Sequence, residues 1–463
     1  MVPAERASGN RPRPLEGRTE SERAAYHSRM GNRFVGSLRL LLALAVAGCA
    51  GPPATPSASQ TDAPASPSAP SPTGTVAADG AAADLDALVS TLDRVHPDAW
   101  HGIAREDFVA ALDAYEAALP GHTAEESVVE LMRVTALLSR AGRDGHQFAL
   151  PQPGCQAPVL PLTVYEFDEG VTITAAAPPH EGLVGATITA IDGSPIDEVL
   201  AAVEPLVPRD GPATVPAFRP IFLPRTEVLR GLGIIGDGPV EVAYDHHGFE
   251  SSEAIDPIAW GAYQDWLGDR GMQQLPASDR SMYLANPEPM TTRLLDDGVL
   301  YIRYRSVQTP STSDASELIE AGSVRRLVLD LRQNPGGDNT TYGTLLDLVQ
   351  DFAEAHPGQL RVLVDRVTFS AAANLATDIE RRTDAVFVGE PMGGGLNFWD
   401  DVTQVRLDSL PVPMQVGVST RYWEFADPDD PRLTIDPDIA VPASSEAFLA
   451  GGDPVLDAAL DAP

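Results

Sequence analysis

The sequence predicts an α/β fold in which parallel strands alternate with helices, and two segments carry that prediction. Residues 326–331 and 360–364 are short apolar runs almost without alternation, which is typical of buried parallel strands. Between them, apolar residues recur at helical spacing (Leu345, Leu348, Val349 and Phe352), and a helical pattern over 371–381 follows the second run. The predicted order is therefore strand, turn, helix, strand, turn, helix.

The two turns of this unit contain residues suited to catalysis. Turns that follow the carboxyl ends of parallel strands converge on a crevice where ligands bind. The first turn contains Gly336 and Gly337, and the second places Ser370 at the start of a helix. Turn chemistry alone also explains the glycines, and an ordinary helix cap also explains the serine. In this order, with one helix between them, they indicate an oxyanion hole beside a nucleophile.

The N-terminal part of the chain reads as targeting sequence. Residues 1–29 are polar and Arg-rich, and we interpret them as a mis-assigned upstream leader. Residues 30–49 have arginines, a short apolar core and small residues before Cys49, as in a bacterial lipoprotein signal peptide. We expect lipidation of Cys49 and a cell-membrane location, lipid-anchored on the extracytoplasmic face. Residues 50–82, rich in Pro, Ala and Ser, predict a disordered tether.

Three folded regions are expected after the tether. Residues 83–150 show apolar residues three and four apart and predict a helical cap, with a break at His96 before Pro97. Residues 151–282 show alternation over 162–165 and 171–174 and predict a β-rich region. The α/β unit occupies residues 283–463.

Composition excludes several functions. The chain has 66 acidic and 32 basic residues and a formal charge of −34, so nucleic-acid binding is not expected. Every basic residue is arginine, so a Ser-Lys catalytic dyad is chemically impossible. The His, Cys and carboxylate residues show no metal-ligand spacing, and we expect neither a metal nor a cofactor.

Residues 294–460 resemble the catalytic domain of tail-specific (carboxyl-terminal-processing) and tricorn-type serine peptidases. The matching sequence motifs are residues 330–337, 368–372, 389–395, 435–439 and 452–456. The resemblance implies a crotonase-like ββα catalytic domain. Because lysine is absent, the resemblance is to the histidine-using, tricorn-like branch. Residues 182–196 resemble the core hairpin of a PDZ-type domain, which implies a PDZ-like insert within 151–282.

The resemblance also assigns roles in the site. Ser370 is the expected nucleophile, with the amides of Ala371 and of Gly336 or Gly337 as oxyanion donors. His146 is the expected base, because the family commonly shows Asp-Gly-His where this chain has Asp144, Gly145 and His146. Tricorn-like enzymes have a serine where Gly145 stands, so a helper hydroxyl is missing. Glu424 falls at the distance where such sites place the orienting acid, although an exposed surface charge explains it equally well.

The expected function is an extracytoplasmic serine peptidase that cleaves unfolded or C-terminal protein segments by Ser/His acyl-enzyme chemistry. Its partners would be protein substrates and the membrane. The alternative is a non-catalytic binding protein for peptides or apolar ligands, because interphotoreceptor retinoid-binding protein resembles these peptidases. An acyl-CoA enzyme is disfavoured, because export removes its substrate and the acidic charge repels a polyphosphate.

Overall fold

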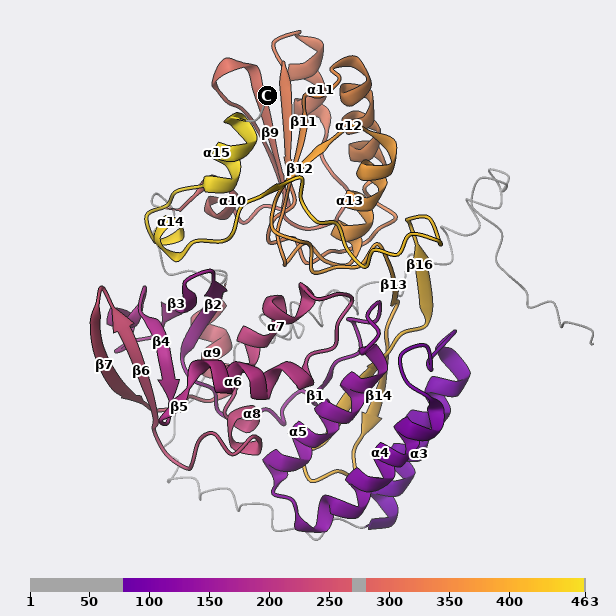
Figure 1. The fold of residues 1–463 in the computed structure, drawn as a ribbon, viewed down its shortest axis with the longest axis vertical. Helices are drawn as coiled ribbons and strands as arrows, with labels where there is room; N and C mark the ends of the chain where they lie inside the picture. The colour runs from indigo at the N-terminus through magenta and orange to yellow at the C-terminus, as the bar shows by residue number, and fades with distance from the viewer. Residues whose placement is uncertain (1–77, 269–279, 462–463) are drawn as a thin grey trace, which may run out of the picture.

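The computed structural model describes residues 78–268 and 280–461 of the chain. The leader, the signal peptide with Cys49 and most of the expected tether lie outside these residues. The first helix of the described residues, α3 (Ala78–Val95), begins within the segment expected to be a tether, because its alanines favour helix and Ala81 and Leu85 are buried. Figure 1 shows the main sheet in the upper part of the molecule, above a second sheet and a group of helices.

The predicted α/β unit forms a six-stranded sheet with the order β17-β12-β11-β10-β9-β8. All neighbouring pairs are parallel except β8 with β9. The predicted strands at 326–331 and 360–364 are β10 (Arg326–Asp330) and β11 (Leu360–Val364), at the centre of the sheet. The others are β8 (Met290–Leu294), β9 (Val299–Tyr304), β12 (Val386–Gly389) and β17 (Ile439–Ala440).

Helices cover both faces of this sheet, which is why its strands lack alternation. Leu327, Leu329 and Val362 pack in one core with α11 (Ser313–Glu320), α12 (Gly343–Ala355) and α13 (Ala371–Arg382). Val328 and Leu363 point to the other face, in a core with Val455 and Leu456 of α15 (Pro454–Asp461). In Figure 1, α12 and α13 lie on one side of the strands and α15 on the other. The mixed α/β prediction is confirmed.

The second sheet has the order β2-β3-β4-β6-β7, and its neighbouring strands run antiparallel. Its strands are β2 (Leu162–Phe167), β3 (Gly170–Ala176), β4 (Thr187–Ile191), β6 (Val240–His246) and β7 (Phe249–Ile255), with β5 (Ser194–Pro195) beside β4. The helices of this region are α6 (Ile196–Val203), α7 (Thr214–Phe222), α8 (Thr226–Gly231) and α9 (Trp260–Leu267). The finer PDZ-like and crotonase-like assignments remain predictions.

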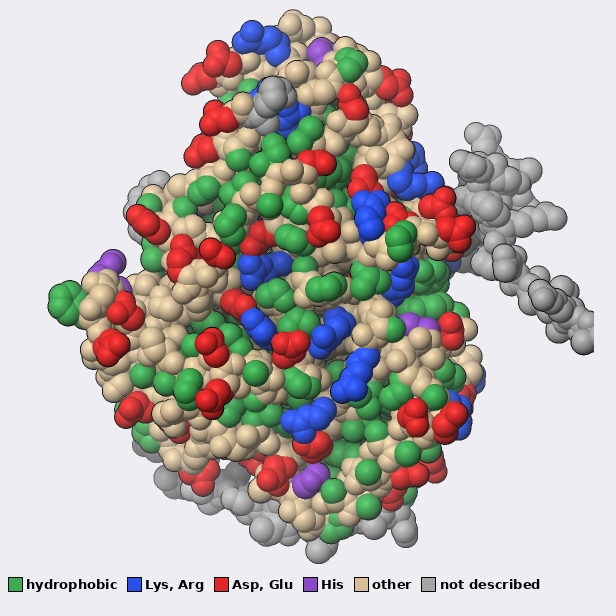
Figure 2. Space-filling model, viewed as in Figure 1, with side chains coloured by type: hydrophobic (Ala, Val, Ile, Leu, Met, Phe, Trp, Pro, Cys, Tyr) green, Lys and Arg blue, Asp and Glu red, His purple; other side chains and the backbone are tan. Residues whose placement is uncertain are grey.

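The two parts of the molecule are joined by arginine side chains. Arg366 pairs with Glu390 beside the main sheet and donates to the carbonyl of Glu166 in β2. Arg219 of α7 pairs with the carboxylate of Glu166. Figure 2 shows several basic side chains across the middle of this face, with acidic side chains both among them and over the rest of the surface. These pairs fix the β2 region against the turn that precedes Ser370.

The N-terminal helical region is connected by strand pairing to the C-terminal part of the chain. It contains α3, α4 (Arg105–Ala118) and α5 (Ala124–Thr135). Thr123 and Glu126 cap the N-terminus of α5. After these helices β1 (Ala149–Pro151) joins β15 (Met414–Val418) and β14 (Thr403–Leu407) in a three-stranded sheet. A two-stranded ribbon, β13 (Asn397–Asp400) with β16 (Arg421–Glu424), lies between β12 and β17 in sequence.

The remaining helices are short: α10 (Met282–Ala285) and α14 (Ser445–Leu449). Among the residues that the structure describes, none of the helices combines the length and the apolar character needed to span a bilayer.

Candidate active site

Ser370 lies at a sharp turn between β11 and α13. Its backbone has φ of 51° and ψ of −127°, a conformation that costs energy for a residue with a side chain. Strain of this kind holds a nucleophilic serine at the tip of a strand-turn-helix unit in α/β-hydrolases. The residue is 7% exposed, and α13 begins immediately after it. The turn therefore presents the hydroxyl at a helix N-terminus, where the helix dipole favours developing negative charge.

Buried hydrogen bonds tie the serine turn to the glycine turn. The carboxylate of Asp365 accepts from the backbone amides of Val367, Thr368 and Gln333. The amide of Phe369 donates to the carbonyl of Asn334 at 3.0 Å. Burial, with the nearby Glu390, raises the pKa of the Asp365 carboxyl above its usual range. The two turns predicted to converge therefore form one rigid unit.

The glycine turn has one amide that donates to no described residue. The Gly336 amide donates to Asn334 Oδ1 at 3.0 Å, whereas the amides of Gly337 and Ala371 have no acceptor among the described residues. A Cβ at Gly336 would lie 2.6 Å from the Cβ of Ser370, so only glycine allows this approach. Of the three expected donors, the structure thus leaves Gly337 and Ala371 available and commits Gly336 to its own turn.

His146 is brought to this turn by strand pairing far along the chain. β1 follows His146 by three residues and pairs with β15, Ala149 opposite Val416. The amide of Gly417 donates to the carbonyl of Phe148, and the amide of Trp399 donates to the carbonyl of Arg143. These contacts place the Asp-Gly-His segment between the helical region and the main sheet.

Aromatic rings, rather than hydrogen bonds, hold the imidazole of His146. Its ring centroid lies 4.6 Å from that of Phe369 and 5.3 Å from that of Phe398. The residue is 5% exposed, and neither ring nitrogen has a hydrogen-bond partner among the described residues. The Nε2 atom lies 3.5 Å from Asp400 Oδ2, an ion pair once the imidazole is protonated. The imidazole is therefore positioned and still free to accept a proton.

Asp400 is the site residue that the sequence analysis missed. Its Oδ2 accepts a hydrogen bond from Ser370 Oγ at 3.2 Å and lies against His146 Nε2. It ends β13, directly before Asp401, whose pKa is raised to about 6 by burial and by the adjacent Asp400. The sequence does show a pair of aspartates, Asp400 and Asp401, after a short, mostly apolar run that follows the glycines at 393–395. This pair is the feature that could have indicated Asp400.

Glu424, the expected acid, is not brought to Ser370 or His146. It pairs with Asn397 in the β13–β16 ladder, whereas Asp400 pairs with Arg421 at the other end. Three residues of strand separate the two positions by about 10 Å. Glu424 is also exposed to solvent. The register of this ribbon, which sequence spacing does not reveal, puts Asp400 at the serine in place of Glu424.

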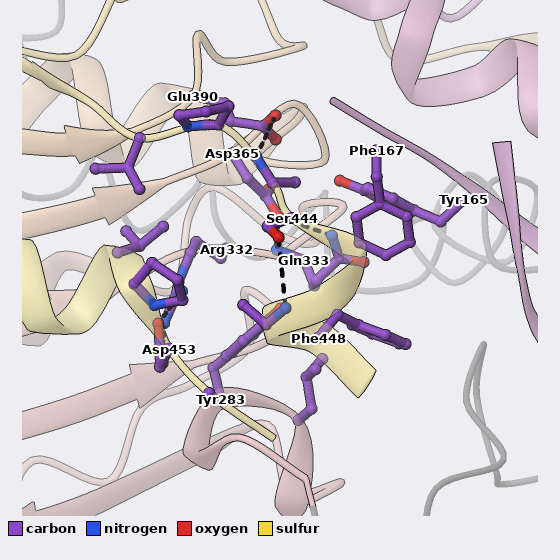
Figure 3. A pocket seen from close by; sticks show the side chains of 18 of the residues that line it. Tyr165, Phe167, Tyr283, Arg332, Gln333, Asp365, Glu390, Ser444, Phe448 and Asp453 are labelled. Atoms are coloured by element: carbon purple, nitrogen blue, oxygen red, sulfur yellow. Dashed lines mark hydrogen bonds and ion pairs between the residues drawn. The ribbon is translucent and has the colours of Figure 1, made fainter. Parts of the chain in front are cut away.

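A separate pocket lies beside the glycine and serine turns (Figure 3). Tyr165 and Phe167 of β2 approach it from one side and Phe448 of α14 from below, while Gln333 and Asp365 form its wall toward the turns. Arg332, paired with Asp330 and Asp453, forms another part of the wall. The space available to water centres is about 70 Å³, enough for several waters. Neither Ser370 nor His146 lines it.

Three potential metal ligands gather beside the histidine segment. Nitrogen or oxygen atoms of His96, His101 and Asp144 lie within 4.8 Å of one another. The amide of Asp98 donates to His96 Nδ1, so in the neutral ring the hydrogen is on Nε2, which donates to Asp144 Oδ2 at 3.1 Å. Ser419 Oγ also donates to Asp144. His96 Nε2 therefore has no lone pair to offer a cation, and the cluster does not fit a metal.

Comparison with known proteins shows the fold. No family model matches the chain, and no curated protein matches it. A mutant of CPAF matches with a TM-score of 0.54 and 13% identity, over 84% of this chain and 99% of its own. Mature CPAF complexed with lactacystin matches with a TM-score of 0.53 and 14% identity, over 82% and 96%.

A third solved structure is less similar. The photosystem II D1 C-terminal processing protease matches at 18% identity, over 81% of this chain and 98% of its own, but its TM-score of 0.36 is too low to bear on the argument. The chain has the fold of CPAF, and the resemblance to tail-specific peptidases is confirmed at the level of the fold.

Proposed function

We propose that this chain is a serine peptidase with Ser370 as nucleophile and the Asp400–His146 pair as proton acceptor. One observation carries the proposal. The hydroxyl of Ser370, the Oδ2 atom of Asp400 and the Nε2 atom of His146 meet beside the free amides of Gly337 and Ala371. The fold shared with CPAF is in accord with this proposal, but the site carries it, because a fold by itself does not determine function.

The chemistry follows from this geometry. As Ser370 Oγ attacks the carbonyl carbon of the scissile peptide, its proton leaves toward Asp400 Oδ2, which shares it with His146 Nε2. The carbonyl π bond opens to an oxyanion that the amides of Gly337 and Ala371 stabilise. The C–N bond then breaks, and the amine leaves with the proton from the acid–base pair. Water repeats these steps on the acyl-enzyme and restores Ser370.

The proposed substrates are unfolded or C-terminal segments of proteins outside the cytoplasm, with the enzyme held to the membrane by lipidated Cys49. The support is the signal-like pattern of residues 30–49 and the resemblance to tail-specific peptidases. Replacement of Cys49 by serine should release the protein from the membrane fraction, because the acyl chains would supply the anchoring.

Labelling of the full chain with a fluorophosphonate tests the nucleophile. The adduct should map to Ser370 and disappear in Ser370→Ala, while Ser419→Ala, a buried serine bonded to Asp144, should retain it. An adduct on another serine would overturn the assignment. Absence of labelling in folded protein that binds peptides or apolar ligands would favour the non-catalytic alternative.

A further inference from the structure

We propose that Asp210 is a positioning residue for His146, holding the histidine segment in place and stabilising the imidazole when it carries a proton. The inference rests on the proposed function, since it concerns the state of His146 that forms during acyl transfer. Asp210 lies in the loop before α7, a region in which the sequence shows no recognisable pattern. It is fully buried.

Asp210 joins two segments that border the nucleophile. Its Oδ1 accepts from the amide of Gly145, directly before His146, at 2.6 Å, and its Oδ2 accepts from the amide of Gly395 at 3.2 Å. Gly394, beside Gly395, packs against the Ser370 turn, where a Cβ on it would lie 3.1 Å from the Ser370 amide. One carboxylate therefore links the backbone that carries the base to the backbone that supports the nucleophile.

The backbone of Asp210 is itself fixed from both sides. Its carbonyl accepts from the amide of Arg143 at 2.8 Å, and its amide donates to Thr214 Oγ1 at 3.1 Å. The Thr214 hydroxyl donates onward to the carbonyl of Gly393 at 2.6 Å. Because main chain and side chain are both held, the carboxylate cannot turn away from Gly145 without breaking several buried hydrogen bonds.

The same carboxylate explains why position 145 is glycine. A Cβ there would lie 2.9 Å from Asp210 Oδ1 and 2.9 Å from its amide nitrogen. No side chain fits at this position while Asp210 occupies the space. The helper hydroxyl that tricorn-like enzymes carry before the histidine is absent from Gly145, and here a buried carboxylate adjoins that position.

Electrostatics points to a role beyond structure. Burial raises the pKa of Asp210 to about 6, while the neighbouring His146 and the two amide donors act in the opposite direction. A positive imidazole thus favours the ionised carboxylate, and by reciprocity the ionised carboxylate favours the protonated imidazole. The other titratable groups around this pair are Asp144, Asp400 and Asp401. Asp210 is distinguished from them by its bond to the backbone of the histidine segment.

An NMR titration of the His146 imidazole in full-length protein tests the proposal without requiring turnover. Measured in a Ser370→Ala background, Asp210→Asn should move the midpoint of the His146 titration to lower pH by about one unit, because a neighbouring negative charge is removed. In the enzyme with Ser370 intact, the same change should lower kcat by about tenfold or more, with KM little changed.

Thr214→Val is the matched control, since it removes hydrogen bonds from the same loop and leaves both charges in place. It should leave the His146 midpoint unmoved. Gly145→Ala, which displaces the Asp210 carboxylate without neutralising it, provides a second variant if Asp210→Asn fails to fold, and it should also lower the midpoint. A midpoint unchanged in every folded variant at positions 210 and 145 overturns the proposal, whether or not the protein proves to be a peptidase.

Discussion

The nucleophile side and the base side of this site are built in different ways. Ser370 and its oxyanion donors come from two turns at the ends of adjacent parallel strands, β10 and β11, and a local hydrogen-bond network holds them together. The base side gathers His146, Asp210 and Asp400 from the helical region, the loop before α7 and a ribbon after β12. The first half follows from sheet topology, whereas the second depends on long-range packing.

The two halves of the site should respond to different kinds of substitution. The serine turn tolerates little, because its backbone is strained and glycine is required against it. The base side relies on aromatic stacking and on carboxylates that approach from separate segments. Added side-chain volume should therefore disturb the serine turn most, whereas loss of a proton-accepting group should disturb the base side most.

The largest effect is expected from His146→Ala. Without the imidazole, only the Asp400 carboxylate remains to take the serine proton and nothing shares it, so kcat should fall by about 10³-fold or more. Fluorophosphonate labelling should be lost as well, while thermal unfolding changes little. The measurement is kcat and adduct formation on folded protein. Full activity in this variant would show that the base side has been placed wrongly.

Asp400→Asn should have the next largest effect. The amide keeps the shape but cannot share the Ser370 proton with His146, so kcat should fall by about 10²-fold. Glu424→Gln, on the same ribbon but at its opposite end, is the control and should retain activity within about twofold. Reversed results would restore Glu424 as the acid. Steady-state kinetics on both variants decides between them.

Gly336→Ala tests the nucleophile side. The new Cβ would lie 2.6 Å from the Cβ of Ser370 and 2.9 Å from the Ala371 nitrogen, so the serine must shift. We expect a loss of about tenfold to 10²-fold in kcat, because small displacements at reacting atoms are costly. Gly121→Ala meets nothing within 4 Å and should be neutral. Equal activities in the two variants would show that the glycine turn does not support the serine.

The smallest effect concerns stability against pH. Burial, with Asp400, raises the pKa of Asp401 to about 6, so the folded chain holds a proton on Asp401 that the unfolded chain has released. This group therefore favours the folded state more as the pH falls through about 6. Between pH 7.5 and 5.5, Tm of the wild type should rise by about 1 °C more than that of Asp401→Asn. An identical pH response in both would contradict the raised pKa.

The sequence alone was enough for the parts of the molecule that local pattern controls. Apolar runs without alternation predicted β10 and β11. The helical pattern that begins after Ser370 predicted α13, and with it the position of Ser370 at the start of a helix. These features depend on residues that are neighbours in the chain, so they can be predicted from periodicity and turn residues without knowledge of the tertiary structure. The motifs in the same segments carried the resemblance that the comparison of folds confirms.

Only the tertiary structure decided the composition of the base side. The β13–β16 register places Asp400 rather than Glu424 against the serine. The spacing of residues along the sequence does not determine how two strands are aligned when they pair. Asp210 reaches Gly145 across 65 residues, from a loop with no motif of its own. The reason is physical: strand pairing and loop packing between distant segments set these contacts, and a linear sequence records which residues are present but not which of them meet.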